Sequence, residues 1–197
     1  RACLNDGVIP VLIDPATRAR EFFSPQVLID AVMAKRNTGT RITDARLVIA
    51  LGPGFTPQVD CHAIIETNRG HYLGRVDWER AAEKNTGVPG EINGKSAERV
   101  LRAPIAGRVQ NVREIGERVV AGDVIARVEN EKVIAPFDGI VRGLIHDGLS
   151  VEQGMKIGDV DARAQREHCF TISDKARAVG GGALEAILFW LRTHSAE

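Results

Sequence analysis

The chain has 197 residues, of which 44% are hydrophobic and 26% charged, and its 26 Lys and Arg residues balance its 26 Asp and Glu residues. This composition is typical of a globular protein, and it excludes the cationic, aromatic-rich surface of a nucleic-acid binder and the long apolar segment of a membrane span. Three cysteines without a CxxC motif favour a reducing compartment, so we expect a cytoplasmic location.

The first 94 residues predict an α/β domain. The apolar run over residues 8–13 predicts a buried strand, which ends at Asp14-Pro15. Ser24-Pro25 has the pattern of a helix start, and the apolar spacing that follows predicts a helix over residues 25–36.

Two further apolar runs, over residues 45–51 and 63–67, predict buried strands. Strand, helix and strand at this spacing indicate a Rossmann-like parallel unit, whose ligands bind beyond the carboxyl ends of the strands. The segment 83–94 is rich in Gly, Asn and Pro and predicts a linker, so we place the domain boundary near residue 95.

An internal repeat follows the linker. The run Ala103-Pro104-Ile105-Ala106-Gly107-Arg108-Val109 returns as Ala135-Pro136-Phe137-Asp138-Gly139-Ile140-Val141, and the 23 columns from Ala103 to Ile125 hold eight identities at one offset of 32 residues. A constant offset predicts two copies of one supersecondary unit folded against each other. We expect an all-β module over residues 95–161.

The motifs of this repeat resemble those of the biotinyl/lipoyl carrier family, whose fold is a barrel-sandwich hybrid. Carriers of that family present a modified lysine at the tip of the hairpin that joins the two halves. Lys132 is the only lysine in the joining segment, lies beyond the expected tip and lacks the carrier setting. We expect no biotin or lipoate on Lys132.

The C-terminal segment, residues 162–197, predicts a strand at 169–172 and a helix that starts at Ser173-Asp174 and returns to the α/β domain. The apolar period of this helix continues through Gly180-Gly181-Gly182. Three helical glycines indicate close packing against a backbone, a break in the helix, or an anion site.

The polar residues that could bind a ligand or take part in a reaction are concentrated in residues 52–71. Asp60 and His62 alternate along an extended segment and form a candidate acid/base pair, and Cys169 is a candidate nucleophile. The spacing of Asp60, His62 and His71 matches no familiar metal site, so we predict no metal. A hydrogen-bonded structural loop and buried, inert cysteines are the alternatives. The candidate ligand-binding residues at the strand ends and the C-terminal helix are Gly52, Gly54, Glu66, Asn68, Arg69, His71, Asp174, Lys175 and Gly181.

Several blocks of the chain resemble a bacterial and archaeal family described as selenium-dependent molybdenum hydroxylase system proteins, the YqeB family. These blocks are 35–40 (Lys-Arg-Asn-Thr-Gly-Thr), 52–55 with 59–71, 89–92 (Pro-Gly-Glu-Ile) and 170–178 with the glycine triplet. Members are regarded as accessory or maturation factors, and they carry an N-terminal Gly-rich nucleotide-binding-like strand and helix that this chain lacks.

The resemblance implies an accessory factor for a molybdenum hydroxylase, with the hydroxylase or its cofactor-insertion machinery as partner. Two alternatives remain open: an enzyme that acts on a small anionic or nucleotide substrate, and an unmodified carrier-like binding module. The sequence leaves the cofactor and the oligomeric state unknown.

Overall fold

A computed structural model describes residues 2–85 and 94–194 of the chain. The chain divides into two compact units, one formed by Arg1–Lys84 with Ala178–Glu197 and the other by Asn85–Arg177. Most of the predicted linker 83–94 lies outside the described residues.

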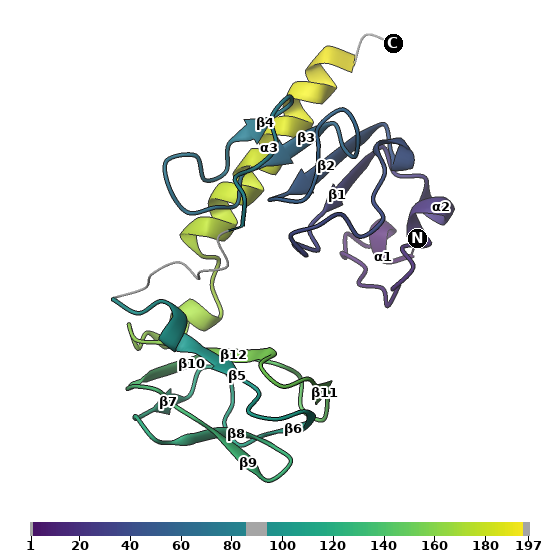
Figure 1. Cartoon of the computed structure of the whole chain (residues 1–197). Coiled ribbons are helices and arrows are strands. Elements are labelled where there is room, and N and C mark those ends of the chain that lie inside the picture. The colour runs from purple at the N-terminus through teal and green to yellow at the C-terminus, as the bar shows by residue number, and fades with distance from the viewer. Residues whose placement is uncertain (1, 86–93, 195–197) are drawn as a thin grey trace. The chain divides into compact units, whose positions relative to one another are not determined.

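The first unit contains a four-stranded sheet in the order β1 (Val27–Asp30), β2 (Leu47–Leu51), β3 (Ala63–Ile65) and β4 (Val76–Asp77). The first three strands are parallel, whereas β4 runs antiparallel to β3. The helix α3 (Asp174–His194) packs along this sheet (Figure 1). The carboxyl ends of β1, β2 and β3 therefore meet at one edge.

The core of this unit follows from the alternation of side chains along β2. Leu47 and Ile49 face α3 and share one buried cluster with Val179, Ala186 and Trp190. Val48 and Ala50 point to the other face, where the loop after β2 contributes Phe55 and Cys61. Both faces of β2 are thus covered, which explains its continuous hydrophobic sequence.

Two sequence predictions in the N-terminal part are wrong. Residues 8–13 form no strand, because no other described strand pairs with them. The helix predicted over residues 25–36 is also absent, because residues 27–30 pair with residues 47–50 of β2 as strand β1. The short elements in this part are α1 (Ala2–Asn5), α2 (Ala19–Phe23) and the 3₁₀ helix η1 (Ile42–Asp44).

The second unit holds two four-stranded sheets (Figure 1). Strands β5 (Val100–Arg102), β6 (Gly107–Asn111), β7 (Arg118–Val119) and β8 (Val124–Val128) come from the first copy of the repeat. Strands β9 (Glu131–Ile134), β10 (Gly139–Leu144), β11 (Ser150–Val151) and β12 (Lys156–Asp161) come from the second. The 3₁₀ helix η2 (Ala97–Arg99) precedes them.

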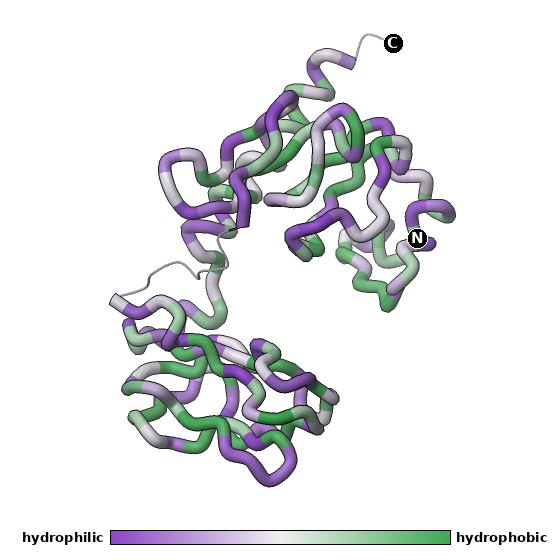
Figure 2. The backbone as a smooth tube through the Cα atoms, in the orientation of Figure 1, coloured by the Kyte–Doolittle hydropathy of each residue, from purple (hydrophilic) through white to green (hydrophobic). Residues whose placement is uncertain are grey.

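The sheets confirm the predicted repeat. One sheet has the order β5-β12-β10-β7, and a shift of 32 residues converts it into the other, β9-β8-β6-β11. Backbone hydrogen bonds repeat with the same shift: the amide of Gly122 donates to Ala135, and the amide of Gly154 donates to Ala103. Each repeat therefore completes the fold of the other. Hydrophobic and hydrophilic residues alternate along the backbone of this unit (Figure 2).

The segment after β12 differs from the prediction. Residues 162–177 are counted with the β unit rather than with the α/β unit. The strand predicted at 169–172 is absent, and residues Arg166–Cys169 form the 3₁₀ helix η3 instead. The thiol of Cys169 donates to the backbone oxygen of Val141, which ties this turn to β10.

The glycine triplet lies inside α3, which runs through it without a break. Gly180 and Gly181 are exposed, and a Cβ added to either would meet no atom within 4 Å. Gly182 is buried, and its added Cβ would overlap the carbonyl oxygen of Gly74 and come within 2.9 Å of Cγ2 of Ile65. The expected close contact is present at Gly182, whereas the proposed site residue Gly181 has no such role.

Among the described residues, no helix has the length and apolarity needed to span a membrane.

Candidate functional site

The carboxyl edge of β1, β2 and β3 combines buried polar side chains with glycine turns. Asp30 ends β1 and is 6% exposed, Gly52 follows β2, and Glu66 follows β3 with 3% exposure. Ligands of parallel α/β sheets bind beyond the carboxyl ends of the strands. This edge is therefore the position in the first unit where the fold itself favours a binding site.

Asn37 joins the loops at this edge. Its Oδ1 accepts hydrogen bonds from the amides of Gly39 and Thr40 at 2.8 Å each, and its Nδ2 donates to Oδ1 of Asp60 at 3.1 Å. Its backbone amide donates to the carbonyl oxygen of Gly54 at 3.1 Å. One side chain thus fixes the loop after β1 to the loop after β2.

Asp30 fixes the same loop to the end of its own strand. One carboxylate oxygen accepts from the hydroxyl of Thr40 at 2.6 Å, and the other accepts from the amide of Val32 at 3.0 Å. The sequence analysis missed Asp30, Asn37 and Thr40. A usable signal was present, because an Asn followed by Thr-Gly is typical of a turn closed by the Asn side chain.

The two glycines predicted here are both required by close contacts. A Cβ at Gly54 (φ +105°) would lie 2.5 Å from the amide nitrogen of Arg36 and 2.7 Å from the carbonyl carbon of Lys35. A Cβ at Gly52 (φ +83°) would lie 2.5 Å from Oγ1 of Thr67. The loop that carries Lys35 and Arg36 therefore sits directly on the turn after β2.

Lys35 itself has an unusual backbone, with φ at +62°. Such left-handed conformations are uncommon for residues other than glycine and are found at functional sites when the surroundings impose them. The side chains of Lys35 and Arg36 are exposed, and neither forms an ion pair with a carboxylate of the described residues. The backbone of two exposed cationic residues is thus held at the carboxyl edge.

The candidate acid/base pair is not assembled in the structure. Asp60 accepts from the amide of Thr56 at 2.7 Å and from Asn37, whereas Nδ1 of His62 accepts from the amide of Val48 at 2.9 Å. No hydrogen bond joins these two described side chains. Burial lowers the pKa of His62, and the positive charge of His194 adds to this effect.

Glu66 and its neighbours form a second hydrogen-bonded group. The Glu66 carboxylate accepts from the amides of Asn68 at 2.6 Å and Glu83 at 2.7 Å, and Nδ2 of Asn68 donates to the Glu83 carboxylate. Arg69 and His71 lie in the exposed turn that follows, where His71 packs edge-on against Tyr72 at 5.0 Å between ring centroids. Glu66 therefore organises this loop from within.

The cysteines are poorly suited to nucleophilic catalysis. Burial, with smaller contributions from Asp60 and Asp30, raises the pKa of the fully buried Cys61 thiol to about 12. Burial also raises the pKa of Cys169, although the positive charge of Arg142 opposes this. A thiolate is the reactive form, so both thiols are held in the unreactive state at neutral pH.

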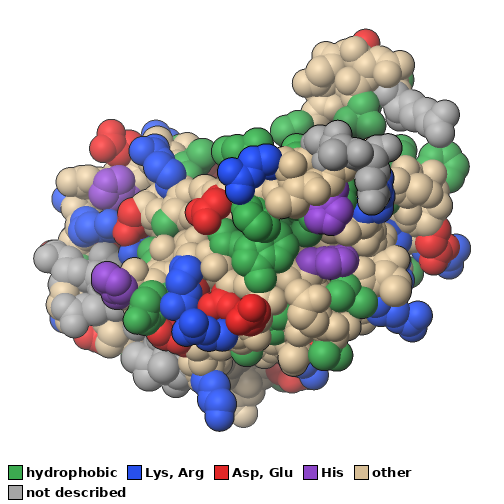
Figure 3. Space-filling view, turned by 90° about the horizontal axis from the view of Figure 1, so that it is seen from above, with side chains coloured by type: hydrophobic (Ala, Val, Ile, Leu, Met, Phe, Trp, Pro, Cys, Tyr) green, Lys and Arg blue, Asp and Glu red, His purple; other side chains and the backbone are tan. Residues whose placement is uncertain are grey.

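The remaining candidates belong to different parts of the chain. Asp174 and Lys175 lie in the first turn of α3 and are counted with the β unit, whereas Gly181 is counted with the α/β unit. Within residues 2–85 and 94–194, no three His, Cys, Asp or Glu side chains are grouped so that they could hold a metal ion. On the face drawn in Figure 3, Lys and Arg side chains are interspersed with Asp and Glu.

The β unit contains a charged cluster that the sequence analysis did not identify. Asp161, 2% exposed, accepts from Nη2 of Arg163 at 2.6 Å and from Nη1 of Arg142 at 3.1 Å. Desolvation of Asp161 raises its pKa, but the hydrogen bonds and charges of the two arginines outweigh this effect and bring the pKa to about 2. This cluster is satisfied internally, so we assign it a structural role.

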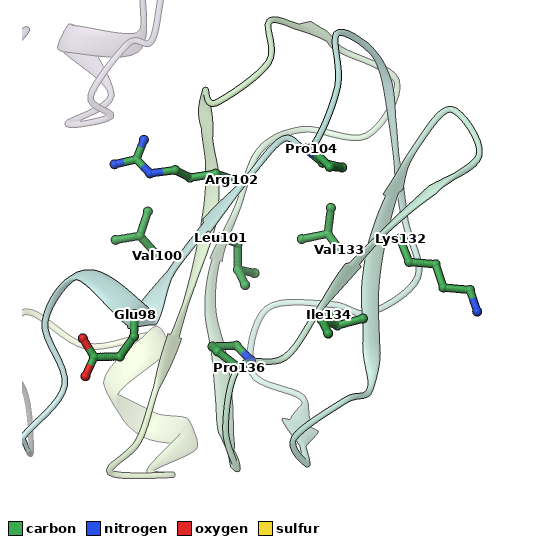
Figure 4. A pocket seen from close by; sticks show the side chains of 9 residues that line it. All are labelled: Glu98, Val100, Leu101, Arg102, Pro104, Lys132, Val133, Ile134 and Pro136. Atoms are coloured by element: carbon green, nitrogen blue, oxygen red, sulfur yellow. The ribbon is translucent and has the colours of Figure 1, made fainter.

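A small pocket of about 180 Å³ lies in the β unit between β5 and β9, which are equivalent strands of the two repeats (Figure 4). Its apolar lining includes Leu101, Val133 and Ile134, whereas Arg102 and Lys132 point away to opposite sides. Sites for drug-sized ligands occupy roughly 300–1,000 Å³. The pocket is therefore too small for a nucleotide or a pterin cofactor.

Lys132 itself does not occupy the tip of its hairpin. The two residues between β8 and β9 are Glu129 and Asn130, and Lys132 pairs with Arg127 within the ladder. The absence of a biotinyl or lipoyl group on Lys132 stays a prediction.

We compared the chain with known proteins. No model of a protein family matches it. A chain in a crystal structure of an aspartoacylase family protein from Mesorhizobium loti aligns with 41% of this chain and 26% of its own length, at 13% identity and a TM-score of 0.29, which is too low to indicate a common fold. The uncharacterized protein YqeB of Escherichia coli K12 is 50% identical over 182 residues, which are 92% of this chain and 34% of YqeB. Over these residues the chain is similar to YqeB, and it spans about one third of the length of that relative.

Proposed function

We propose that the chain binds an anionic, phosphate-bearing ligand at the carboxyl edge of β1–β3 and acts as an accessory factor for a molybdenum hydroxylase. The observation that carries the proposal is the loop 35–40, which Asn37 locks onto Gly54 and Asp60 while Lys35 and Arg36 stay exposed and without an ion-pair partner among the described residues. A preorganised pair of cations at the ligand-binding edge of a parallel sheet suits a phosphate group.

The resemblance of the chain to the YqeB family supports the accessory role, and the site adds a chemical reason. The molybdenum cofactor is built on a pterin that carries a phosphate group, so a factor that handles this cofactor needs a site for that phosphate. The loop at residues 35–40 supplies the charge, and the turn at Gly52–Gly54 supplies close backbone approach.

The alternative of an acid/base enzyme has less support. The carboxylate of Asp60 is occupied by Thr56 and Asn37, and the basic nitrogen Nδ1 of His62 accepts from a backbone amide. A general base needs a free acceptor within reach of the proton that it abstracts.

The test is calorimetric titration of the chain with inorganic phosphate, a nucleoside monophosphate and a phosphorylated pterin. Replacement of Lys35 by Asn removes the charge and tolerates the left-handed backbone, so the fold should persist while affinity falls about tenfold or more, which is about 1.4 kcal/mol. Arg118→Gln, which neutralises an exposed cation on β7, is the matched control and should leave affinity unchanged. Equal losses in both variants, or none in Lys35→Asn, would reject this site.

A second experiment addresses the accessory role separately. A molybdenum hydroxylase is produced with the wild-type chain, with the Lys35→Asn variant or without either, and the active fraction is measured. We expect activation by the wild-type chain that the variant supports less well. Ligand binding without any effect on the hydroxylase would leave the site in place and refute the accessory role.

A further inference from the structure

The N-terminal part of the first unit exposes an unusual number of hydrophobic side chains. Of the 25 large hydrophobic residues that are exposed in the described chain, eleven lie between residues 4 and 33. They are Leu4, Val8, Ile9, Val11, Leu12, Ile13, Phe22, Phe23, Ile29, Val32 and Met33. Concentrations of this kind mark interaction sites, whereas scattered exposed residues do not.

The run over residues 8–13 is the most exposed part of this surface. Ile9 is 86% exposed, Val11 is 94% exposed and Ile13 is fully exposed. The backbone of residues 9–13 forms no hydrogen bond with any other described residue. Apart from Pro10, residues 8–13 are β-branched or aliphatic, and such a composition is typical of a strand that is covered on both faces in a parallel sheet. In the described chain, however, no strand pairs with residues 8–13.

The sheet of the same unit has a free edge next to this run in sequence. β1 pairs only with β2, so one side of its backbone has no strand partner in the described chain. Its four residues include no lysine, proline or bulge, which are the features that usually protect an edge strand, and Ile29 is 41% exposed. An unpaired sheet edge and a run with the sequence pattern of a strand therefore occur within 25 residues of each other.

We propose that residues 4–33 form a docking surface for a polypeptide that adds strands beside β1 and covers residues 8–13 on both faces. The eleven side chains together expose on the order of 1,000 Å², which matches the roughly 800 Å² that each partner contributes to a stable interface. The occupant is the polypeptide equivalent to the two thirds of YqeB that lie outside its alignment with these residues. A second copy of the chain would offer only the same unpaired edge and no layers to cover both faces of the run.

The first test is hydrogen exchange, followed by mass spectrometry, on intact Escherichia coli YqeB and on this chain alone. In the chain alone, the amides of residues 9 and 11–13 should exchange at the rate of an unstructured peptide. In YqeB, the aligned segment and the segment aligned with β1 should exchange at least 100-fold more slowly. Fast exchange in both proteins would overturn the proposal, and so would slow exchange in the chain alone.

The second test mixes the chain with a polypeptide that contains only the unaligned part of YqeB and measures molar mass by light scattering after gel filtration. We expect a 1:1 complex that a double variant, Ile9→Asp with Ile13→Asp, weakens at least tenfold. Both side chains are exposed, so the variant should fold. Leu184→Asp, at an exposed position of α3 outside this surface, is the control and should bind normally.

Three results would contradict the inference. The first is a complex that the double variant binds as tightly as the wild-type chain. The second is a homodimer of this chain that buries residues 8–13, which would assign the surface to a second copy. The third is binding to vesicles of anionic phospholipid that the double variant abolishes, which would assign it to a membrane surface.

Discussion

Replacement of Gly182 by Ala should destabilise the α/β unit, whereas the same change at Gly181 should stabilise it. At Gly182 the added methyl group would overlap the carbonyl oxygen of Gly74 and approach Cγ2 of Ile65 to 2.9 Å. Because one obstacle is backbone, the helix and the loop at Gly74 must separate. Overpacking of this kind costs about 3 kcal/mol at its upper end, and the better helix propensity of Ala returns about 1 kcal/mol. We expect a net loss of about 2 kcal/mol.

At Gly181 the propensity gain remains and the clash is absent, because no atom lies within 4 Å of the added Cβ. Gly181→Ala should therefore stabilise the unit by about 0.5–1 kcal/mol. The two variants differ by one position in the same helix and add the same methyl group, so each is the control for the other.

Urea denaturation followed by tryptophan fluorescence measures this difference. Both tryptophans, Trp78 and Trp190, belong to the α/β unit, so the signal reports the unfolding of that unit without interference from the β unit. Equal stability of the two variants, or a Gly182→Ala variant at least as stable as the wild-type chain, would refute the close packing of α3 against Gly74.

Three further predictions concern titratable groups. Asp161→Asn should destabilise the β unit by about 2 kcal/mol at pH 7, because the variant loses the interactions that lower the pKa of Asp161 to about 2. Because the pKa of Asp161 is lowered to about 2, this contribution to stability is present above pH 4 and is lost as the pH falls toward 2. The melting temperatures of variant and wild type, measured by circular dichroism, should therefore converge in acid. A difference that stays constant with pH would refute the assignment. Because burial lowers the pKa of His62, its protonation opposes folding, and stability should fall as the pH drops below about 6.5. His62→Asn keeps an acceptor for the backbone amide and should flatten that part of the melting-temperature profile; an unchanged profile would assign the effect to another group. A thiol reagent should modify exposed Cys3 at once and Cys61 only after unfolding, and rapid modification of Cys61 in the native chain would contradict its burial.

The β unit could be predicted from the sequence because the same pattern of turns and strands occurs in each of its two repeats. The glycines at 116 and 148 keep one offset and both adopt positive φ, and the strands between the turns keep the same offset. Symmetry therefore converts a weak pattern of short strands into a definite fold.

The first unit was harder to predict because tertiary pairing overrides local preference. The pattern after Ser24-Pro25 is compatible with a helix, yet Val27 and Ile29 are β-branched, and pairing with β2 decides the outcome. For residues 8–13 the pattern of a buried strand is strong, but the described chain supplies no neighbouring strand.

The candidate site was predicted in position and not in detail. The Gly-Pro-Gly turn after a buried strand located the carboxyl edge correctly. The alternation of Asp60 and His62 suggested a common face, but the loop folds back through the hydrogen bond from the amide of Asp60 to the carbonyl oxygen of Thr56. The link between Asn37 and Asp60 spans 23 residues of sequence, and no local pattern encodes such a contact.

Anion binding at the carboxyl edge is most directly tested by titration of the ¹⁵N-labelled chain with inorganic phosphate, with backbone amide shifts followed by NMR. The account predicts saturable shifts confined to the amides of residues 35–40 and 52–54, and their loss in Lys35→Asn. Shifts that appear only in the β unit, or no saturable shift at any amide, would contradict it.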